Sequence, residues 1–180
     1  MSTLVPKTRP QATLDDVRQM LIDNLDDFLI EDQKVAIVGV RGYYKRTMGD
    51  PFKNDRNLYD DAMFIVTPDR LVAFNCNVDP SKYRKGIATL KAGVYRAVRW
   101  RHKGKYAALQ IVDDMVQRDG QIGVDRGRHG INFHYGGDND TWSEGCQTFP
   151  KSQYWQFQGL IYELMETHDL TSVTYLLVEN

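Results

Sequence analysis

The chain has 180 residues, of which 42% are hydrophobic and 26% charged, and its formal net charge is −1. This length and composition are those of one globular domain that buries a core without disulfide staples. The near-zero charge gives no electrostatic ground for a nucleic-acid partner, and no stretch approaches the ~20 apolar residues of a membrane span. We therefore expect a flexible arm over residues 1–12 and a single domain over residues 13–180.

The N-terminal segment carries the signals of an amphipathic helix. Thr13 is a favourable N-cap, and Asp15 and Asp16 fall in the first turn, where the helix dipole favours acidic side chains. Apolar residues then recur at helical spacing, at Leu14, Val17, Leu21, Leu25 and Phe28. We expect a helix that ends near Leu29 and packs this apolar stripe against the core.

The middle of the chain predicts β-structure. Short apolar runs bounded by turn residues predict strands over residues 34–40, 62–67, 70–75, 95–100 and 106–112. Residues 45–59 have no period and predict a long loop. His102 falls in the turn between the last two strands, where we expect it to face solvent. Residues 113–128 are polar and rich in glycine, and we expect a loop that lines the approach to a site.

A short segment near residue 140 brings the candidate chemistry together. Alternation of apolar and polar residues predicts a strand over residues 131–135, and Gly136 and Gly137 end it. Cys146 follows a polar turn, so His134 and Cys146 lie on neighbouring segments. An imidazole within reach of a cysteine can generate the nucleophilic thiolate at neutral pH. Gly145 leaves room for a substrate carbonyl, whose oxyanion nearby backbone N–H groups would hold.

Two alternatives accompany this site. His129 competes with His134 as the base, but His134 lies on a strand, which fixes a side chain more firmly than a loop does. A zinc site built from His129, His134 and Cys146 is the second alternative. Neither His-Glu-x-x-His nor Cys-x-x-Cys spacing is present, so we expect no metal and no cofactor.

The same residues resemble the catalytic domain of the L,D-transpeptidase (YkuD-like) family. The segments Phe133-His134-Tyr135-Gly136 and Ser143-Glu144-Gly145-Cys146 are similar to the two family motifs, within a resemblance that spans about residues 92–150. Glu144 stands where the family has histidine, and Thr148 stands where it commonly has arginine. The Gly-Cys-Gln-Thr form is similar to that of phage-borne members.

The resemblance implies a mainly β, α+β fold with a sandwich or barrel core. To this core the sequence pattern adds the N-terminal helix and a second helix that begins after Pro150. The resemblance implies Cys146 as nucleophile, His134 as base and Gly145 beside the oxyanion. We expect substrate contacts from the neighbouring residues His129, Tyr135, Gly136, Ser143 and Glu144. Ser143 can instead orient the loop, and Glu144 can be a plain exposed carboxylate. A last apolar run predicts a strand over residues 172–178.

The resemblance also implies a function at the cell wall. The expected partner is a peptidoglycan stem peptide, cleaved or exchanged through an acyl-enzyme. The first ten residues contain no apolar run of the signal-peptide kind, so we expect synthesis in the cytoplasm without a signal peptide. A phage endolysin released by a holin fits that expectation best. The alternatives are a true transpeptidase, a secreted wall-targeting toxin, and a non-enzymatic phage structural or wall-binding protein.

Overall fold

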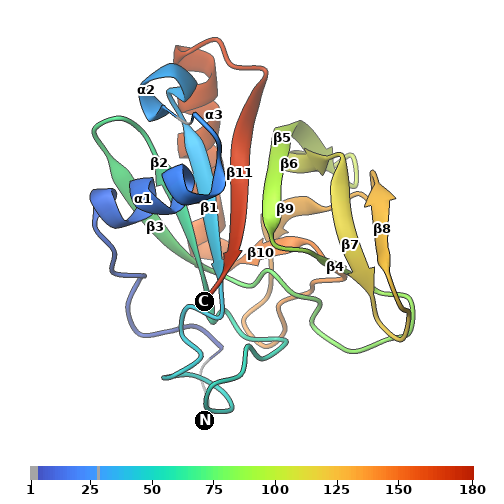
Figure 1. Ribbon diagram of the computed structural model, residues 1–180. Coiled ribbons are helices and arrows are strands. Elements are labelled where there is room, and N and C mark those ends of the chain that lie inside the picture. The colour runs from blue at the N-terminus through green and yellow to red at the C-terminus, as the bar shows by residue number, and fades with distance from the viewer. Residues whose placement is uncertain (1–3, 28) are drawn as a thin grey trace.

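Eight strands form one curled sheet in the computed structural model, which describes residues 4–27 and 29–180 (Figure 1). In chain order they are β1 (Ala36–Arg41), β2 (Asp61–Val66), β3 (Leu71–Cys76), β5 (Gly93–His102), β6 (Tyr106–Val112), β9 (Asn132–Tyr135), β10 (Gln147–Phe149) and β11 (Ser172–Glu179). The spatial order is β10-β9-β6-β5-β11-β1-β2-β3. The pairs β1–β11 and β9–β10 are parallel and the others antiparallel, so the sheet is mixed.

The two edges of this sheet almost meet. Just beyond β3, Asn77 pairs with Thr148 of β10, and each backbone N–H donates to the other residue's carbonyl at 2.8 Å. This bridge makes the sheet a nearly closed barrel. The expectation of a mainly β protein with a helix near each end is confirmed.

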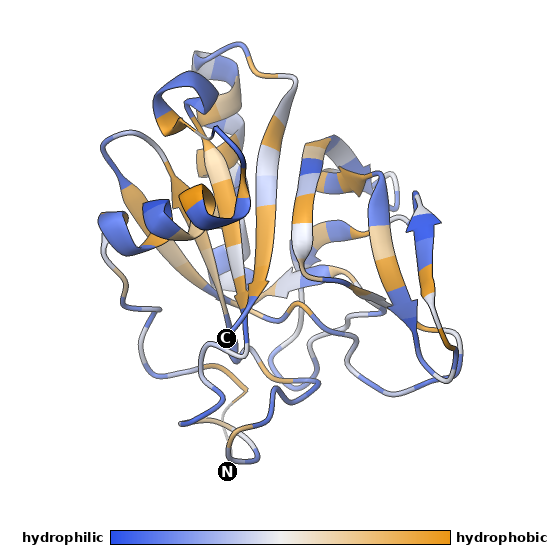
Figure 2. Cartoon of the chain, viewed as in Figure 1, coloured by the Kyte–Doolittle hydropathy of each residue, from blue (hydrophilic) through white to orange (hydrophobic). Residues whose placement is uncertain are grey.

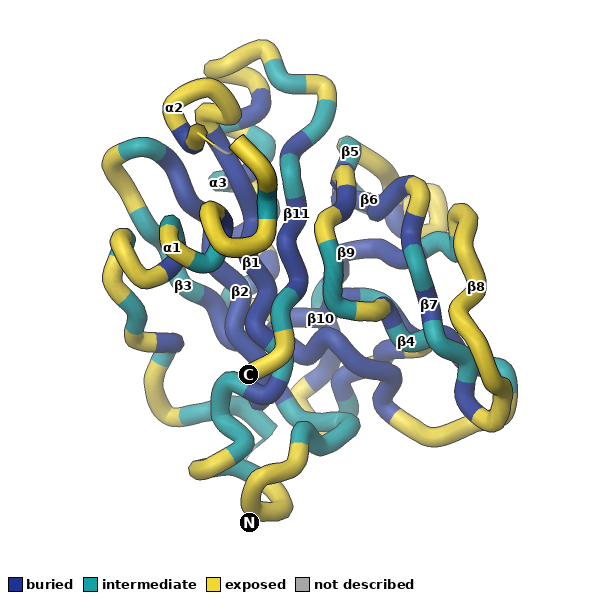
Figure 3. The backbone as a smooth tube through the Cα atoms, in the orientation of Figure 1, coloured by how far each residue is buried: buried dark blue, intermediate teal, exposed yellow. Residues whose placement is uncertain are grey.

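Each face of the sheet is covered by different helices, because strand side chains alternate between faces. On one face, Ala36 and Val38 of β1 pack with helix α1 (Leu14–Asn24) and the short helix α2 (Ile30–Gln33). On the other face, Ile37 joins the main core with helix α3 (Lys151–Thr167), whose buried residues are Tyr154, Phe157, Ile161 and Met165. Figure 2 shows apolar residues concentrated on the central strands of the large sheet, such as β1 and β2, and Figure 3 shows these strands as buried.

The N-terminal helix is confirmed but is shorter than predicted. Thr13 and Asp16 form a capping box, while the extended backbone of Leu25 ends α1 at Asn24. Phe28, which the predicted stripe included, lies outside the described residues. Part of the predicted arm is described from residue 4 onward and lies against the domain. Arg9, for example, donates to the Ala73 carbonyl at 3.3 Å.

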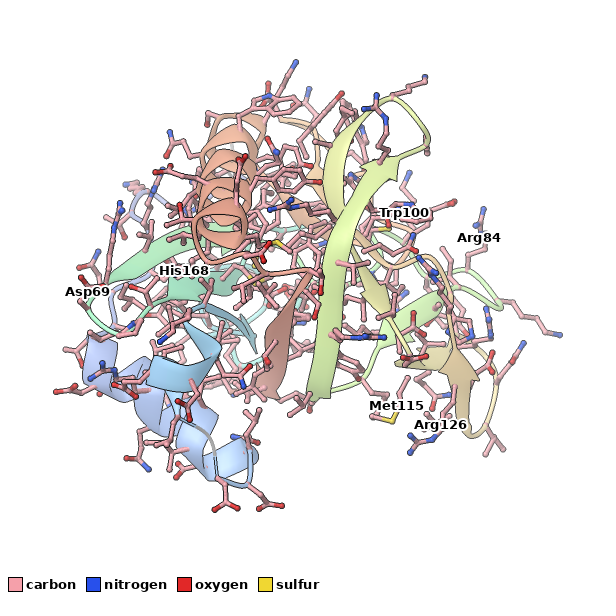
Figure 4. The ribbon with its side chains drawn as sticks, turned by 90° about the horizontal axis from the view of Figure 1, so that it is seen from above. Asp69, Arg84, Trp100, Met115, Arg126 and His168 are labelled. Atoms are coloured by element: carbon pink, nitrogen blue, oxygen red, sulfur yellow. The ribbon has the colours of Figure 1, made fainter. Side chains whose placement is uncertain are left out.

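The predicted loop over residues 113–128 is wrong. These residues contribute β7 (Asp114–Arg118) and β8 (Val124–Gly127), which join β4 (Ala88–Leu90) in a second, three-stranded sheet. The labelled Met115 and Arg126 are cross-strand partners in it and lie together in Figure 4. Strand β8 is exposed along its whole length, so its sequence lacks the alternation of apolar and polar residues from which a strand is predicted.

The other predicted elements are confirmed with small changes at their ends. The strands of residues 34–40, 62–67, 70–75, 95–100, 106–112, 131–135 and 172–178 correspond to β1, β2, β3, β5, β6, β9 and β11, and the helix after Pro150 is α3. No helix of the described residues combines the length and apolarity that crossing a membrane demands.

Candidate active site

A cavity of about 500 Å³ brings the predicted nucleophile and base together. Both Cys146 and His134 line it, because β10 runs parallel to β9 and His134 is the register partner of Thr148, two residues after the cysteine. The loop between the two strands therefore places Cys146 directly before the first residue of β10, beside β9. The other lining residues are Ser81, Lys82, Arg84, Ile87, His102, Lys103, Asp140, Trp142, Ser143 and Glu144.

The sulfur of Cys146 is half-buried and lies against the start of β9. The Asn132 backbone N–H donates to Sγ at 3.4 Å, and Sγ lies 3.8 Å from the Gly130 carbonyl oxygen. Among the described residues, no hydrogen bond joins Sγ to an imidazole. Burial raises the pKa of the Cys146 thiol, an effect that the Asn132 N–H and the Lys103 charge oppose. At neutral pH the resting group is therefore the thiol.

His134 is held in a form that can accept a proton. Its Nδ1 lies 2.8 Å from the Tyr135 carbonyl oxygen, which can only accept, so Nδ1 carries the hydrogen and Nε2 carries the lone pair. The pKa of His134 is lowered to about 4, mainly by burial; the adjacent His102 and Lys103 contribute to the decrease, and the hydrogen bond to the Tyr135 carbonyl opposes it. The resting pair is thus thiol and neutral imidazole, and not the ion pair that a thiolate formed in advance would require.

His102 is the residue that the sequence placed wrongly. It was expected in solvent, but its side chain is only 9% exposed and its ring stacks on His134, with centroids 4.3 Å apart. His102 is the last residue of β5. Strand β6 lies between β5 and β9 in the sheet, and this strand order places His102 beside His134. Nothing local in the sequence marks this contact. Asn132, by contrast, lies two residues before His134 on the same face of β9, and the alternating pattern of the sequence predicts this shared face.

Ser143 and Gly145 hold the loop in front of Cys146. Ser143 Oγ donates to the Cys146 carbonyl at 2.8 Å and accepts from the Gly145 N–H at 3.1 Å. Ser143 therefore orients the loop, and the Gly145 N–H is already occupied. A Cβ on Gly145 would collide with the Ala88 carbonyl, and its φ of +115° is also unfavourable for other residues. The hydrogen bonds of the described residues include none from the Cys146 N–H, which leaves that donor for an oxyanion.

Two exposed ion pairs border the cavity. Arg84 Nη2 contacts Glu144 Oε1 at 2.9 Å, and Lys82 Nζ lies 3.8 Å from Asp140 Oδ2. Figure 4 shows Arg84 at the outer edge of the molecule. Lys103 also lines the cavity and, among the described residues, has no carboxylate within ion-pair distance. The cavity border thus includes two paired cations, Lys82 and Arg84, and one cation, Lys103, without a carboxylate partner among the described residues.

A second cavity of about 270 Å³ adjoins the first and shares His102, Lys103, His134 and Trp142 with it. Tyr106 and Tyr135 complete its aromatic wall, with ring centroids 5.0 Å apart. Tyr135 thus borders this second cavity. Trp142 is 58% exposed, so its indole adds an accessible aromatic surface to both cavities.

Two of the expected substrate-binding residues lie away from the cavity lining. The backbone N–H and ring Nδ1 of His129 contact Asp114, and its Nε2 lies 3.0 Å from Asp125 Oδ2. Gly136 is buried and donates to the Phe149 carbonyl at 2.8 Å. A side chain at Gly136 would collide with Tyr59 and Thr141, which gives this glycine a packing role.

The zinc alternative has no geometric support within residues 4–27 and 29–180, where no three His, Cys, Asp or Glu side chains are grouped as metal ligands. Cys76 is fully buried in β3, and burial raises the pKa of its thiol well above the ordinary value.

Comparison with known proteins adds no family to this geometry, since neither a protein-family model nor a curated protein matches the sequence. The chemistry of the site is therefore inferred from its residues and their geometry. It combines a thiol, a proton-accepting imidazole beside the same cavity, a backbone donor on the sulfur and an unoccupied N–H at the nucleophile. These are the parts needed for acyl transfer.

Proposed function

We propose that the protein is a peptidoglycan-active cysteine enzyme that cleaves or exchanges a stem-peptide bond through a Cys146 acyl-enzyme. One observation carries the acyl-transfer part: Cys146 and His134 line one cavity, and the Tyr135 carbonyl leaves His134 Nε2 free to accept a proton. The substrate class comes from the resemblance of both motifs to the L,D-transpeptidases. The nearly closed mixed sheet agrees with the barrel-like core that this resemblance implies.

In the first half of the reaction the Cys146 thiol loses its proton to His134 Nε2 while sulfur bonds to the scissile carbonyl carbon. The carbonyl oxygen gains negative charge, which the Cys146 N–H stabilises. The C–N bond then breaks, and His134 returns the proton to the leaving amine. Because both resting groups are neutral, proton transfer accompanies the attack. Apo geometry that lacks a direct sulfur–imidazole hydrogen bond is compatible with this, since such bonds often tighten only with substrate present.

The second half releases the acyl group from sulfur. Water, or an amine, attacks the thioester carbon and gives its proton to His134, and the sulfur leaves and recovers that proton. Water gives a hydrolase of the endolysin type, whose exit from the cytoplasm a holin would provide. An amine gives a transpeptidase, and either chemistry suits a wall-targeting toxin.

The deciding experiment is mass spectrometry of purified muropeptides incubated with the protein in H₂¹⁸O, with a free D-amino acid as competing amine. Hydrolysis adds one ¹⁸O to the new carboxylate, whereas exchange adds the D-amino acid and no ¹⁸O. The matched controls are Cys146→Ala, expected to be inactive, and Cys76→Ala, expected to be active. Unchanged muropeptides with the wild-type protein, across tetrapeptide and pentapeptide stems, would reject the proposal.

A non-enzymatic wall-binding role is the second candidate, and one observation favours it. Burial raises the pKa of the Cys146 thiol, and among the described residues no imidazole contacts the sulfur. A binding protein would sediment with purified sacculi and release no product, and Cys146→Ala would bind as well as the wild type. An enzyme would release soluble or altered muropeptides in the same assay.

A further inference from the structure

A chain of hydrogen bonds runs from the protein surface to His102. Arg128 Nε donates to Gln110 Oε1 at 2.7 Å, and Gln110 Nε2 donates to Asn132 Oδ1 at 2.9 Å. Asn132 Nδ2 in turn lies 3.1 Å from His102 Nδ1. We call these four side chains the amide relay. Gln110 and Asn132 are register partners on β6 and β9, so the sheet itself fixes the central step.

The amide relay has only one possible direction. A guanidinium can only donate, so the oxygen of Gln110 must face Arg128 and its amide nitrogen must face Asn132. The same reasoning turns the Asn132 amide nitrogen toward His102. His102 Nδ1 must then be the acceptor, which leaves the ring hydrogen of the neutral imidazole on Nε2.

His134 has the opposite arrangement, because its Nδ1 donates to the Tyr135 carbonyl and its Nε2 carries the lone pair. The two stacked rings therefore present one donor and one acceptor side by side. Neither Nε2 has a protein partner among the described residues, and neither is a buried unpaired atom. Both side chains line the Cys146 cavity and the cavity beside it, and each Nε2 is accessible to solvent.

The surroundings hold this arrangement in place. Gln110 and Asn132 are buried, so a reversed amide would leave poorly satisfied polar groups in a largely buried site. The Arg128 guanidinium lies 4.8 Å from the ring centroid of Trp100 on β5, which anchors the surface end of the relay. Burial and the adjacent Lys103 lower the pKa of His102, which keeps the ring neutral.

We propose that His102 is a second substrate-contacting residue, whose Nε2–H, set by the amide relay, donates to the substrate carbonyl oxygen while His134 Nε2 accepts the thiol proton. The donor role rests on the proposed function, but the assignment of the ring hydrogens does not. His102 would join the Cys146 N–H in stabilising the oxyanion.

Nitrogen-15 NMR of labelled histidine side chains in the full-length protein tests the assignment without substrate. We expect His102 to carry its hydrogen on Nε2 and His134 on Nδ1 at pH 7. Gln110→Glu should place a proton on His102 Nδ1, because a carboxylate can only accept and so turns the Asn132 oxygen toward the ring. Gln110→Leu is the matched control and should give a mixture of the two forms. A wild-type His102 with its hydrogen on Nδ1, or one unaffected by Gln110→Glu, would overturn the inference.

Activity on muropeptides tests the donor role. His102→Phe keeps a ring over His134 but has no N–H, so kcat should fall by ~10²–10³ with little change in KM, as for loss of an oxyanion donor. His102→Gln keeps an N–H and should recover part of that loss. Full kcat in His102→Phe would disprove the donor role. If even the wild type has no turnover, the proposed function and the donor role fail together, while the NMR result still decides the ring hydrogens.

Discussion

The β9–β10 end of the large sheet and the segment that follows β8 of the small sheet each contain a histidine, His134 and His129, but the hydrogen bonds of the two rings differ. Around His134 only one ring nitrogen has a protein partner, and the other is accessible to solvent. Around His129 both ring nitrogens contact carboxylates, those of Asp114 and Asp125. The two histidines are five positions apart, so the chemistry of each depends on which hydrogen-bonding capacity the fold leaves unused. The first region therefore keeps the free ring nitrogen that the proposed reaction requires, whereas both ring nitrogens in the second region have carboxylate partners.

The largest expected effect is a difference in activity between variants of the two cysteines. Cys146→Ala should reduce turnover of muropeptides below detection while the protein remains folded, because a thiol-to-methyl change costs little packing. Cys76→Ala should keep activity, because Cys76 lies in the core with no exposed surface. Product formation followed by mass spectrometry, together with circular dichroism, checks both. An essential Cys76 and a dispensable Cys146 would show that the reactive region has been misplaced.

The next effect concerns the two histidines themselves. His134→Ala should lower kcat by ~10²–10⁴, the usual cost of losing a general base. His129→Ala should lower it by much less, because both of its ring nitrogens are already occupied and it does not line the Cys146 cavity. Steady-state kinetics of the two variants at pH 7 checks this ranking. The reverse ranking would move the base to the small-sheet side and would contradict the comparison directly.

The stability of the folded protein should depend on the protonation of His134. Its pKa is about 4 when folded, below the ordinary value of 6.5, so the unfolded chain binds a proton first as the pH falls. The free energy of unfolding should therefore decrease as the pH falls from about 6.5 to about 4, and His134 should account for about 3 kcal/mol of that decrease. Urea unfolding at pH 7 and pH 4 measures the loss.

His134→Gln supplies the control for that loss, because glutamine does not titrate. The wild type minus variant difference removes the contribution of the buried carboxyls that the two proteins share. His102, Lys103 and Cys146 are the titratable groups beside His134, and they remain in both proteins. An equal pH dependence in the two proteins would mean that His134 titrates normally.

The small sheet should show a loss of stability without a comparable loss of rate. His129→Ala removes the ring contacts to Asp114, which is fully buried, and to Asp125. A buried carboxylate left with fewer partners costs ~1–3 kcal/mol. Thermal unfolding measures the loss, and His129→Gln, which keeps a donor, should recover part of it. An unchanged midpoint in His129→Ala would remove the structural role assigned to this cluster.

The sequence predicted the parts of this molecule that depend on local patterns. Alternation placed β9, helical spacing placed α1 and α3, and the Cys146–His134 pair followed from their short separation along one strand–turn–strand segment. The contact between His102 and His134 was missed because it depends on the order β5-β6-β9 in the sheet, which no local pattern encodes. Strand β8 was missed for a related reason, since its backbone pairs with β7 while all its side chains face solvent.

Those failures share one physical cause. Period and turn chemistry report burial and backbone conformation along a few residues, whereas strand order reports which distant surfaces meet. The protonation state of the site also depends on that second kind of information. Burial and the stacked His102 keep His134 neutral, so the thiolate expected from a nearby imidazole gives way to a neutral thiol–imidazole pair in the folded protein.

The smallest expected effect is that of a chelator. EDTA should leave the rate unchanged, because the Cys146–His134 scheme assigns proton transfer to the imidazole and charge stabilisation to N–H donors. A zinc enzyme built from His129, His134 and Cys146 would lose activity with EDTA and regain it with added zinc. In the fold, His129 is committed to Asp114 and Asp125, so such a site would first have to break those contacts. Alkylation of Cys146 cannot separate the two schemes, since it would also remove a zinc ligand. Metal analysis of the purified protein can, and stoichiometric zinc lost together with activity would replace the thiol mechanism with a metal one.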